Sequence, residues 1–276
     1  MGYIFSNVLL QLLYVIGSIF IIGFIINLLN KAFYSTTRYH GLAIYGTGFI
    51  GTPIHELSHA AMCLLFGHHI EEIKLFQIDR DTGTLGYVVH SYNKKNLWAV
   101  MGNYFIGIAP IACGAVVLFF GIKLLIPETF AVVSGELEAF SVYISGGASW
   151  DWLPKLWELF VNFLSALFAE SLSTYKWWIF IFLAMCIALH MNLSGADIKG
   201  ALPSLPIVAA VVIILNLIFG LLSKSLYAHF LRLANRLGGY IIGILLLSVT
   251  LSLFYVALAW IIKYMIVGLR KIIFRR

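Results

Sequence analysis

The sequence predicts an all-α integral membrane protein of about six transmembrane helices, with a small membrane-associated β-hairpin after the second helix. The 276-residue chain is 61% hydrophobic and 11% charged, with a mean hydropathy of +0.95. It is far more apolar than a water-soluble domain of this size. Apolar stretches of about 20 residues, long enough to cross a ~30 Å hydrocarbon core as helices, recur along the chain. After the second stretch, the pattern changes to short β-branched and aromatic runs separated by turn residues.

We expect a single polytopic membrane domain over residues 1–276. The predicted transmembrane segments are residues 5–29, 42–66, 97–125, 177–193, 206–222 and 240–269. No separate soluble domain remains when these segments are subtracted. The first segment lacks the basic region and the cleavage site of a removable signal peptide, so we expect it to be retained as a helix.

Two connecting regions have distinct compositions. Residues 69–78 and 83–92 are rich in β-branched and aromatic side chains, and residues 79–83 have strong turn chemistry, which predicts a hairpin at the membrane surface. The hairpin is either a connector or an edge to which an extended substrate strand adds. Residues 127–154 are predicted to form an acidic loop. An amphipathic helix at the membrane interface is expected over residues 156–172.

Charge and cysteine content exclude several classes of function. The net charge of +6 has no basic patch interleaved with aromatic residues, so it indicates contact with anionic lipid headgroups and no nucleic-acid partner. Cys63, Cys113 and Cys186 lie in apolar segments without CxxC spacing and are interpreted as small buried hydrophobic residues. The basic tail at 270–276 is placed in the cytoplasm, and six crossings then place the N-terminus there too. Compactness and the lack of a targeting segment favour a bacterial plasma membrane.

The candidate catalytic centre is the motif His55-Glu56-Leu57-Ser58-His59 within the second predicted span. Histidines four residues apart project from one face of a helix, so both imidazoles can bind one zinc ion. Glu56 is not needed as a ligand and can take a proton from a metal-bound water, whose pKa the metal lowers to ~7. Such groups are costly at membrane depth unless they have a function. The motif therefore predicts a hydrolase with Zn²⁺ as its cofactor.

A zinc hydrolase usually has a third protein ligand and leaves the fourth position to water. Asp197 is the main candidate, because it follows the fourth predicted span and precedes the fifth. Helix capping is the other possible role of Asp197, and His190 is the alternative third ligand. Asn192 and Asn103 are candidates for contacting the substrate or orienting a ligand.

These features together resemble the site-2 protease family of intramembrane zinc metalloproteases. The resemblance covers about residues 44–200, with an HExxH motif in a membrane helix, a surface hairpin, a glycine-rich span, and a later Asn and Asp before a Gly. It implies that His55 and His59 are zinc ligands, that Glu56 is the general base, and that Asp197 is the third ligand. The family's second motif normally contains prolines and Leu-Asp-Gly, which are missing here. The chain would therefore be a divergent member.

The sequence thus predicts an intramembrane zinc-dependent endopeptidase that hydrolyses a peptide bond in or near a transmembrane segment of a membrane-protein substrate. Two alternatives remain. One is a proteolytically inactive relative that binds membrane proteins, and the other is a metal-ion transporter that uses the same residues as a transient site. Transport usually requires polar groups along a path through the membrane. Their concentration at one depth favours the protease.

Overall fold

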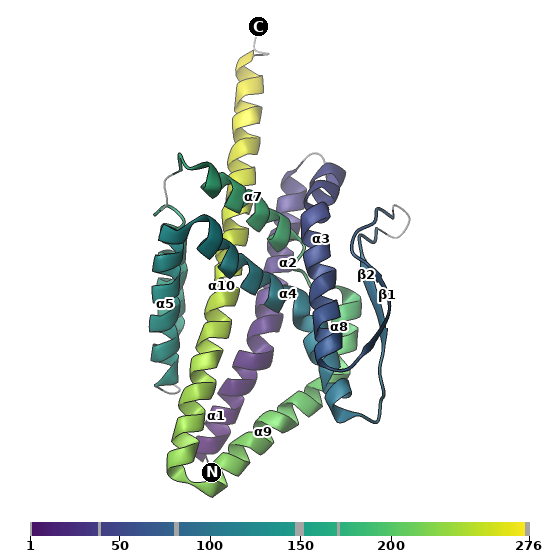
Figure 1. Ribbon diagram of the computed structural model, residues 1–276. Coiled ribbons are helices and arrows are strands. Elements are labelled where there is room, and N and C mark those ends of the chain that lie inside the picture. Colours follow the sequence, from purple (N-terminus) through teal and green to yellow (C-terminus); the bar gives the residue numbers. More distant parts are fainter. Residues whose placement is uncertain (1, 38–39, 80–82, 147–151, 170–171, 274–276) are drawn as a thin grey trace.

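The computed structural model describes all residues except 1, 38–39, 80–82, 147–151, 170–171 and 274–276. The described chain forms a mainly helical bundle with a two-stranded antiparallel sheet on one side (Figure 1). In chain order the elements are α1 (Gly2–Leu12), the π-helical turn η1 (Leu13–Gly17), α2 (Ser18–Thr36), α3 (His40–Leu65), β1 (His69–Lys74), β2 (Tyr87–Ser91), α4 (Leu97–Leu125), α5 (Pro127–Ser145), α6 (Trp152–Ala166), α7 (Tyr175–Leu189), α8 (Gly195–Ala201), the 3-10 turn η2 (Leu202–Ser204), α9 (Leu205–Leu222) and α10 (Lys224–Ile273).

Within the described residues, four helical segments are long and apolar enough to cross a membrane: Ile4–Thr36, Leu97–Leu125, Gly195–Leu222 and Lys224–Gly268. The six predicted spans are therefore not confirmed, although each of them coincides with a helix. The polar His55–His59 motif interrupts the apolar character of α3, and α7 has only 15 residues. Four apolar helices are compatible with a membrane protein, and the bacterial origin stays a prediction.

The last long helices do not simply alternate in direction. Both α7 and α9 run toward the end of the bundle that holds the N-terminus, one after the other, and α10 then returns along the full length (Figure 1). The first and last described residues consequently lie at opposite ends of the bundle. The placement of both termini in the cytoplasm stays a prediction.

The predicted acidic loop is wrong over most of its length, because α5 occupies residues 127–145. Pro127 stands in the first turn, where proline is well tolerated. Apolar side chains on one face of α5 are buried, namely Val133, Leu137, Phe140 and Ile144. They pack against α10 at positions where glycines allow close approach, since a Cβ at Gly243 would lie 2.3 Å from Leu137 Cδ2. A helix is also present where the amphipathic one was expected over residues 156–172, as α6, which begins at Trp152 and ends at Ala166; its position at the membrane interface stays a prediction.

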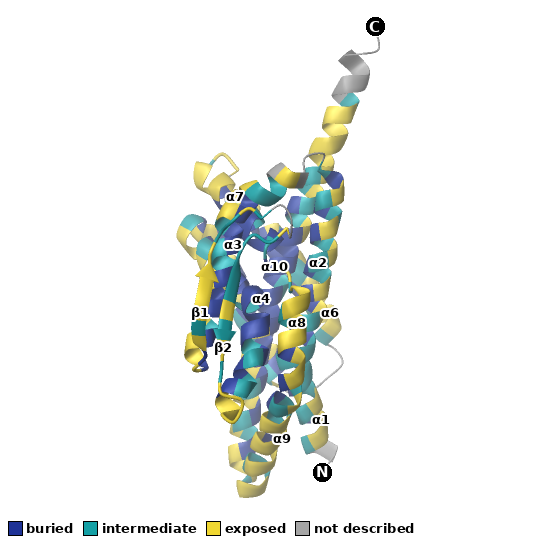
Figure 2. Cartoon of the chain, turned by 90° about the vertical axis from the view of Figure 1, so that its right-hand side faces the viewer, coloured by how far each residue is buried: buried dark blue, intermediate teal, exposed yellow. Residues whose placement is uncertain are grey.

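The core lies behind the hairpin. Figure 2 shows the buried residues concentrated around α4 and α10, whereas β1 and α9 are largely exposed and β2 is mostly half-buried. On α9, large apolar side chains such as Ile214, Ile218 and Leu221 are exposed, as expected of a surface that contacts lipid. The 50-residue α10 includes the predicted polar link before residue 240 and continues as one helix to Ile273.

The predicted β-hairpin is confirmed as a small antiparallel sheet. Ile70 pairs with His90 and Ile73 with Val88, with an irregularity between Ile70 and Glu72. The regular strands are shorter than the predicted runs, and the centre of the predicted turn, residues 80–82, lies outside the described residues. The hairpin follows α3 directly, so it lies beside the helix that carries the motif (Figure 2).

Candidate metal centre

The two motif histidines are oriented by backbone carbonyls of other elements. His55 Nδ1 lies 2.7 Å from the carbonyl oxygen of His190, just after α7, and His59 Nδ1 lies 2.8 Å from that of Ile106 in α4. A carbonyl oxygen only accepts hydrogen bonds, so each ring donates from Nδ1. In the neutral rings, each Nε2 therefore keeps a free lone pair, which is the form that binds metals.

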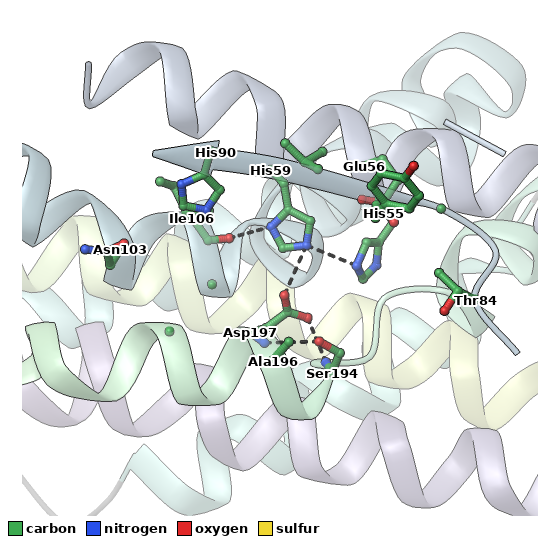
Figure 3. A pocket seen from close by; sticks show the side chains of 15 residues that line it. His55, Glu56, His59, Thr84, His90, Asn103, Ile106, Ser194, Ala196 and Asp197 are labelled. Atoms are coloured by element: carbon green, nitrogen blue, oxygen red, sulfur yellow. Dashed lines mark hydrogen bonds and ion pairs between the residues drawn. The ribbon is translucent and has the colours of Figure 1, made fainter. Parts of the chain in front are cut away.

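Asp197 brings a carboxylate to the same point from α8. Its Oδ1 lies 3.3 Å from His59 Nε2, and His55 Nε2 lies 3.1 Å from His59 Nε2 (Figure 3). With bonds of ~2.0–2.2 Å, atoms that share a tetrahedral zinc ion lie roughly 3–4 Å apart. Three lone-pair atoms facing one point are favourable when a cation lies between them. The chemistry of this donor set fits a divalent cation such as zinc.

A capping box holds the Asp197 carboxylate in place. The backbone N–H of Ser194 donates to Asp197 Oδ2 at 2.7 Å, and the backbone N–H of Asp197 donates to Ser194 Oγ at 3.0 Å. The cap uses Oδ2, whereas Oδ1 faces His59. Capping and ligation, which the sequence left as alternatives, are thus geometrically compatible in one side chain.

Glycines let the surrounding elements approach the centre closely. A Cβ at Gly107 of α4 would lie 2.6 Å from the carbonyl oxygen of Asp197, so only glycine lets α8 pack at this depth. A Cβ at Gly86, just before β2, would lie 2.8 Å from both Glu56 Cγ and Thr52 Cγ2. The hairpin therefore rests directly on the side chain of the predicted general base.

A cavity of about 480 Å³ adjoins the three candidate ligands. Its walls come from α3, α4, α8, and β2 with the segment before it. The residues that line it are His55, Glu56, His59, Thr84, Gly86, Tyr87, Val88, His90, Asn103, Ile106, Gly107, Ser194, Ala196, Asp197 and Gly200. Glu56 is 6% exposed and borders this cavity. The candidate base and the candidate ligands therefore border the same cavity.

The other predicted site residues have different positions. The ring of His190 points to α3, with Nε2 3.1 Å from Thr47 Oγ1 and Nδ1 3.5 Å from Thr52 Oγ1. Among the described residues, the three-ligand group around the motif contains Asp197 and not His190. Asn103 lines the cavity, and its side-chain amide donates to the carbonyl of Val100 at 3.1 Å; its contact with a substrate or ligand stays a prediction. Asn192 is exposed and is not among the described residues that line it.

Sequence reasoning missed two parts of the site. The carbonyl oxygens that orient the histidines carry no sequence signal, because every residue has one. The sequence contained only a weak indication of the cavity wall formed by residues 84–88 and His90, namely the β-branched and aromatic run that predicted a strand there. Its contact with Glu56 depends on how the hairpin folds back on α3.

No protein-family model matches this chain, and neither the curated proteins nor the solved structures compared with it gave a match. The functional interpretation therefore depends on the motif, on the geometry of the candidate ligands and on the cavity.

Proposed function

We propose that this chain is an intramembrane zinc endopeptidase, a divergent relative of the site-2 proteases. The observation that carries the proposal is the convergence of His55 Nε2, His59 Nε2 and Asp197 Oδ1, with all three atoms within 4.8 Å of one another. Zinc bound to these atoms supplies a Lewis acid that polarises the scissile carbonyl and acidifies the attacking water.

Glu56 performs the proton transfers in this proposal. Its side chain is 6% exposed and borders the cavity, with Gly86 packed against its Cγ. The carboxylate accepts a proton from the attacking water and then donates it to the leaving amine. Because the amine departs only when protonated, loss of this carboxylate affects both steps.

The hairpin offers a binding surface for the substrate. β1 and β2 form a two-stranded sheet, so each strand has one edge that is not paired within the sheet. Tyr87, Val88 and His90 of β2 line the cavity. A peptide within a helix has its carbonyl groups hydrogen-bonded, so a transmembrane substrate must unwind before cleavage. The unwound segment adds to the edge of β2 as an extended strand beside the zinc site.

The variant Glu56→Gln tests the mechanism. The full chain, purified in detergent and loaded with zinc, is incubated with labelled casein and with labelled peptides that contain one apolar span. General acid–base catalysis contributes about 10²–10⁴-fold, so we expect cleavage to fall by at least about 10²-fold while zinc content is unchanged. Glu128→Gln, an exposed glutamate at the start of α5, is the matched control and should leave both unchanged. Wild-type cleavage by Glu56→Gln would refute the mechanism.

The same preparations separate the protease from the two alternatives. A binding protein would retain the apolar peptides without cleaving them, in the wild type as in Glu56→Gln. A metal-ion transporter would move zinc into proteoliposomes, and this flux would be lost in His59→Ala. Peptide cleavage that requires Glu56 and zinc, without zinc flux, supports the endopeptidase.

A further inference from the structure

The end of α3 brings a cysteine and a histidine together. Gly67 has a φ of +71°, its N–H donates to the carbonyl of Leu64 at 3.2 Å, and the N–H of His68 donates to the carbonyl of Cys63 at 2.8 Å. These two bonds define a Schellman motif, in which the residue after the glycine folds back over the last turn of the helix. The contact between those two positions is frequently apolar. Here it joins an imidazole to a thiol.

The hairpin adds a second histidine to this pair. His90 of β2 places its Nδ1 3.0 Å from His68 Nδ1, and Cys63 Sγ lies within 4.8 Å of a ring nitrogen of each histidine. Cys63 is fully buried and His68 is 4% exposed, whereas His90 is half-buried at the cavity wall. Three metal-binding side chains thus meet from the helix end, the helix–strand junction and the second strand.

The ring of His68 is held with one lone pair toward this cluster. Its Nε2 lies 2.8 Å from the carbonyl oxygen of Ala99, so Nε2 carries the hydrogen and Nδ1 is unprotonated in the neutral ring. A Cβ at Gly102 would lie 3.1 Å from Nε2, and the glycine therefore leaves room for the ring. The ring also stacks on Tyr92, with centroids 4.7 Å apart. These contacts orient the candidate ligand without help from a metal.

We propose that Cys63, His68 and His90 bind a second zinc ion, distinct from the one at the His55–His59–Asp197 centre. A thiolate with two imidazoles is a donor set that zinc prefers, and the 3.0 Å between the two ring nitrogens is close to the roughly 3–4 Å expected for ligands of one ion. Three protein ligands leave a fourth position for water or another small ligand.

The second ion would fix the hairpin relative to the catalytic helix. Cys63 lies four residues after His59, so the two metal groups follow one another along the same face of α3. His90 belongs to the strand that forms the cavity wall. An ion shared by Cys63 and His90 therefore ties that wall to the helix. This inference does not depend on proteolytic activity.

Cobalt substitution separates the two metal groups. Only the second has a thiol, so only it can give a thiolate-to-cobalt charge-transfer absorption band. For the full chain in detergent, we expect the band in the wild type and in His59→Ala, and its loss in Cys63→Ser. Zinc content should fall from about two ions per chain to about one in Cys63→Ser. His69→Ala, which changes the exposed neighbour of His68, should retain the band and both ions.

A second variant tests whether replacing cysteine by serine disrupts the fold in general. Replacing both Cys113 and Cys186 by serine leaves Cys63 as the sole thiol, and this variant should keep the band. Absence of the band in the wild type, or zinc content unaffected by Cys63→Ser, would overturn the proposal and leave a plain hydrogen bond from His90 to His68. A band without peptide cleavage would support the second site while counting against the endopeptidase. Peptide cleavage without the band would support the endopeptidase and count against the second zinc site.

Discussion

Removing Asp197 tests whether its carboxylate binds zinc or only caps α8. Its Oδ1 faces His59 at 3.3 Å, and its Oδ2 accepts the N–H of Ser194 at 2.7 Å. Asp197→Ala removes the candidate ligand together with half of the capping box. Ser194→Ala removes the other half, the Oγ acceptor, and leaves the carboxylate. The two variants therefore separate the cap from the ligand.

The expected effects differ by more than an order of magnitude. Zinc sites with four protein ligands have apparent binding free energies of about 10–16 kcal/mol, or about 2.5–4 kcal/mol per ligand. Loss of one ligand then weakens zinc binding by roughly 10²–10³-fold. Loss of an N-cap acceptor costs about 0.5–2 kcal/mol of stability. Only part of this cost lowers the affinity for zinc. We expect at least about 10²-fold weaker binding in Asp197→Ala and less than about tenfold in Ser194→Ala.

The assay is a zinc titration against a competing chelator. The full chain is used in detergent, in a Cys63→Ser background, so that binding at the second group does not contribute. Thermal unfolding of both variants is measured in parallel to report the cost of losing the cap. Equal weakening of zinc binding in the two variants would show that the carboxylate acts through the cap. Wild-type affinity in Asp197→Ala would exclude it as a ligand, and either result would refute our reasoning.

Two further predictions concern the contact between α3 and the end of α7. His190→Ala should keep zinc affinity within about tenfold of the wild type, because both ring nitrogens contact threonine hydroxyls and the carbonyl that orients His55 is retained. A loss of affinity comparable to that of Asp197→Ala in the same titration would contradict this prediction. Gly51→Ala should destabilise the protein by about 1–3 kcal/mol or more, since its Cβ would lie 2.2 Å from the carbonyl oxygen of Cys186. Gly46→Ala is the matched control, because nothing lies within 4 Å of a Cβ built there and alanine is more favourable than glycine in a helix by about 0.5–1 kcal/mol. Equal melting temperatures for the two variants would count against close packing at Gly51.

The sequence by itself determined the features that depend on neighbours a few residues away. Helical periodicity places His55 and His59 on one face, and turn chemistry with β-branched runs predicted the hairpin. The length of each apolar stretch predicted a helix at each of the proposed spans. The same periodicity extends to Cys63, four residues after His59, but the sequence offered no reason to interpret that cysteine as more than a buried hydrophobic residue.

Only the tertiary structure decided which distant groups meet these local features. Asp197 and His190 were both plausible from their sequence context, and the packing of α8 on Gly107 brought the carboxylate of Asp197 to the histidines. The ring of His190 instead contacts Thr47 and Thr52 of α3. The second cluster likewise required β2 to fold back on the end of α3. Such contacts join segments far apart in the chain, and they depend on helix directions and close approaches that no local pattern encodes.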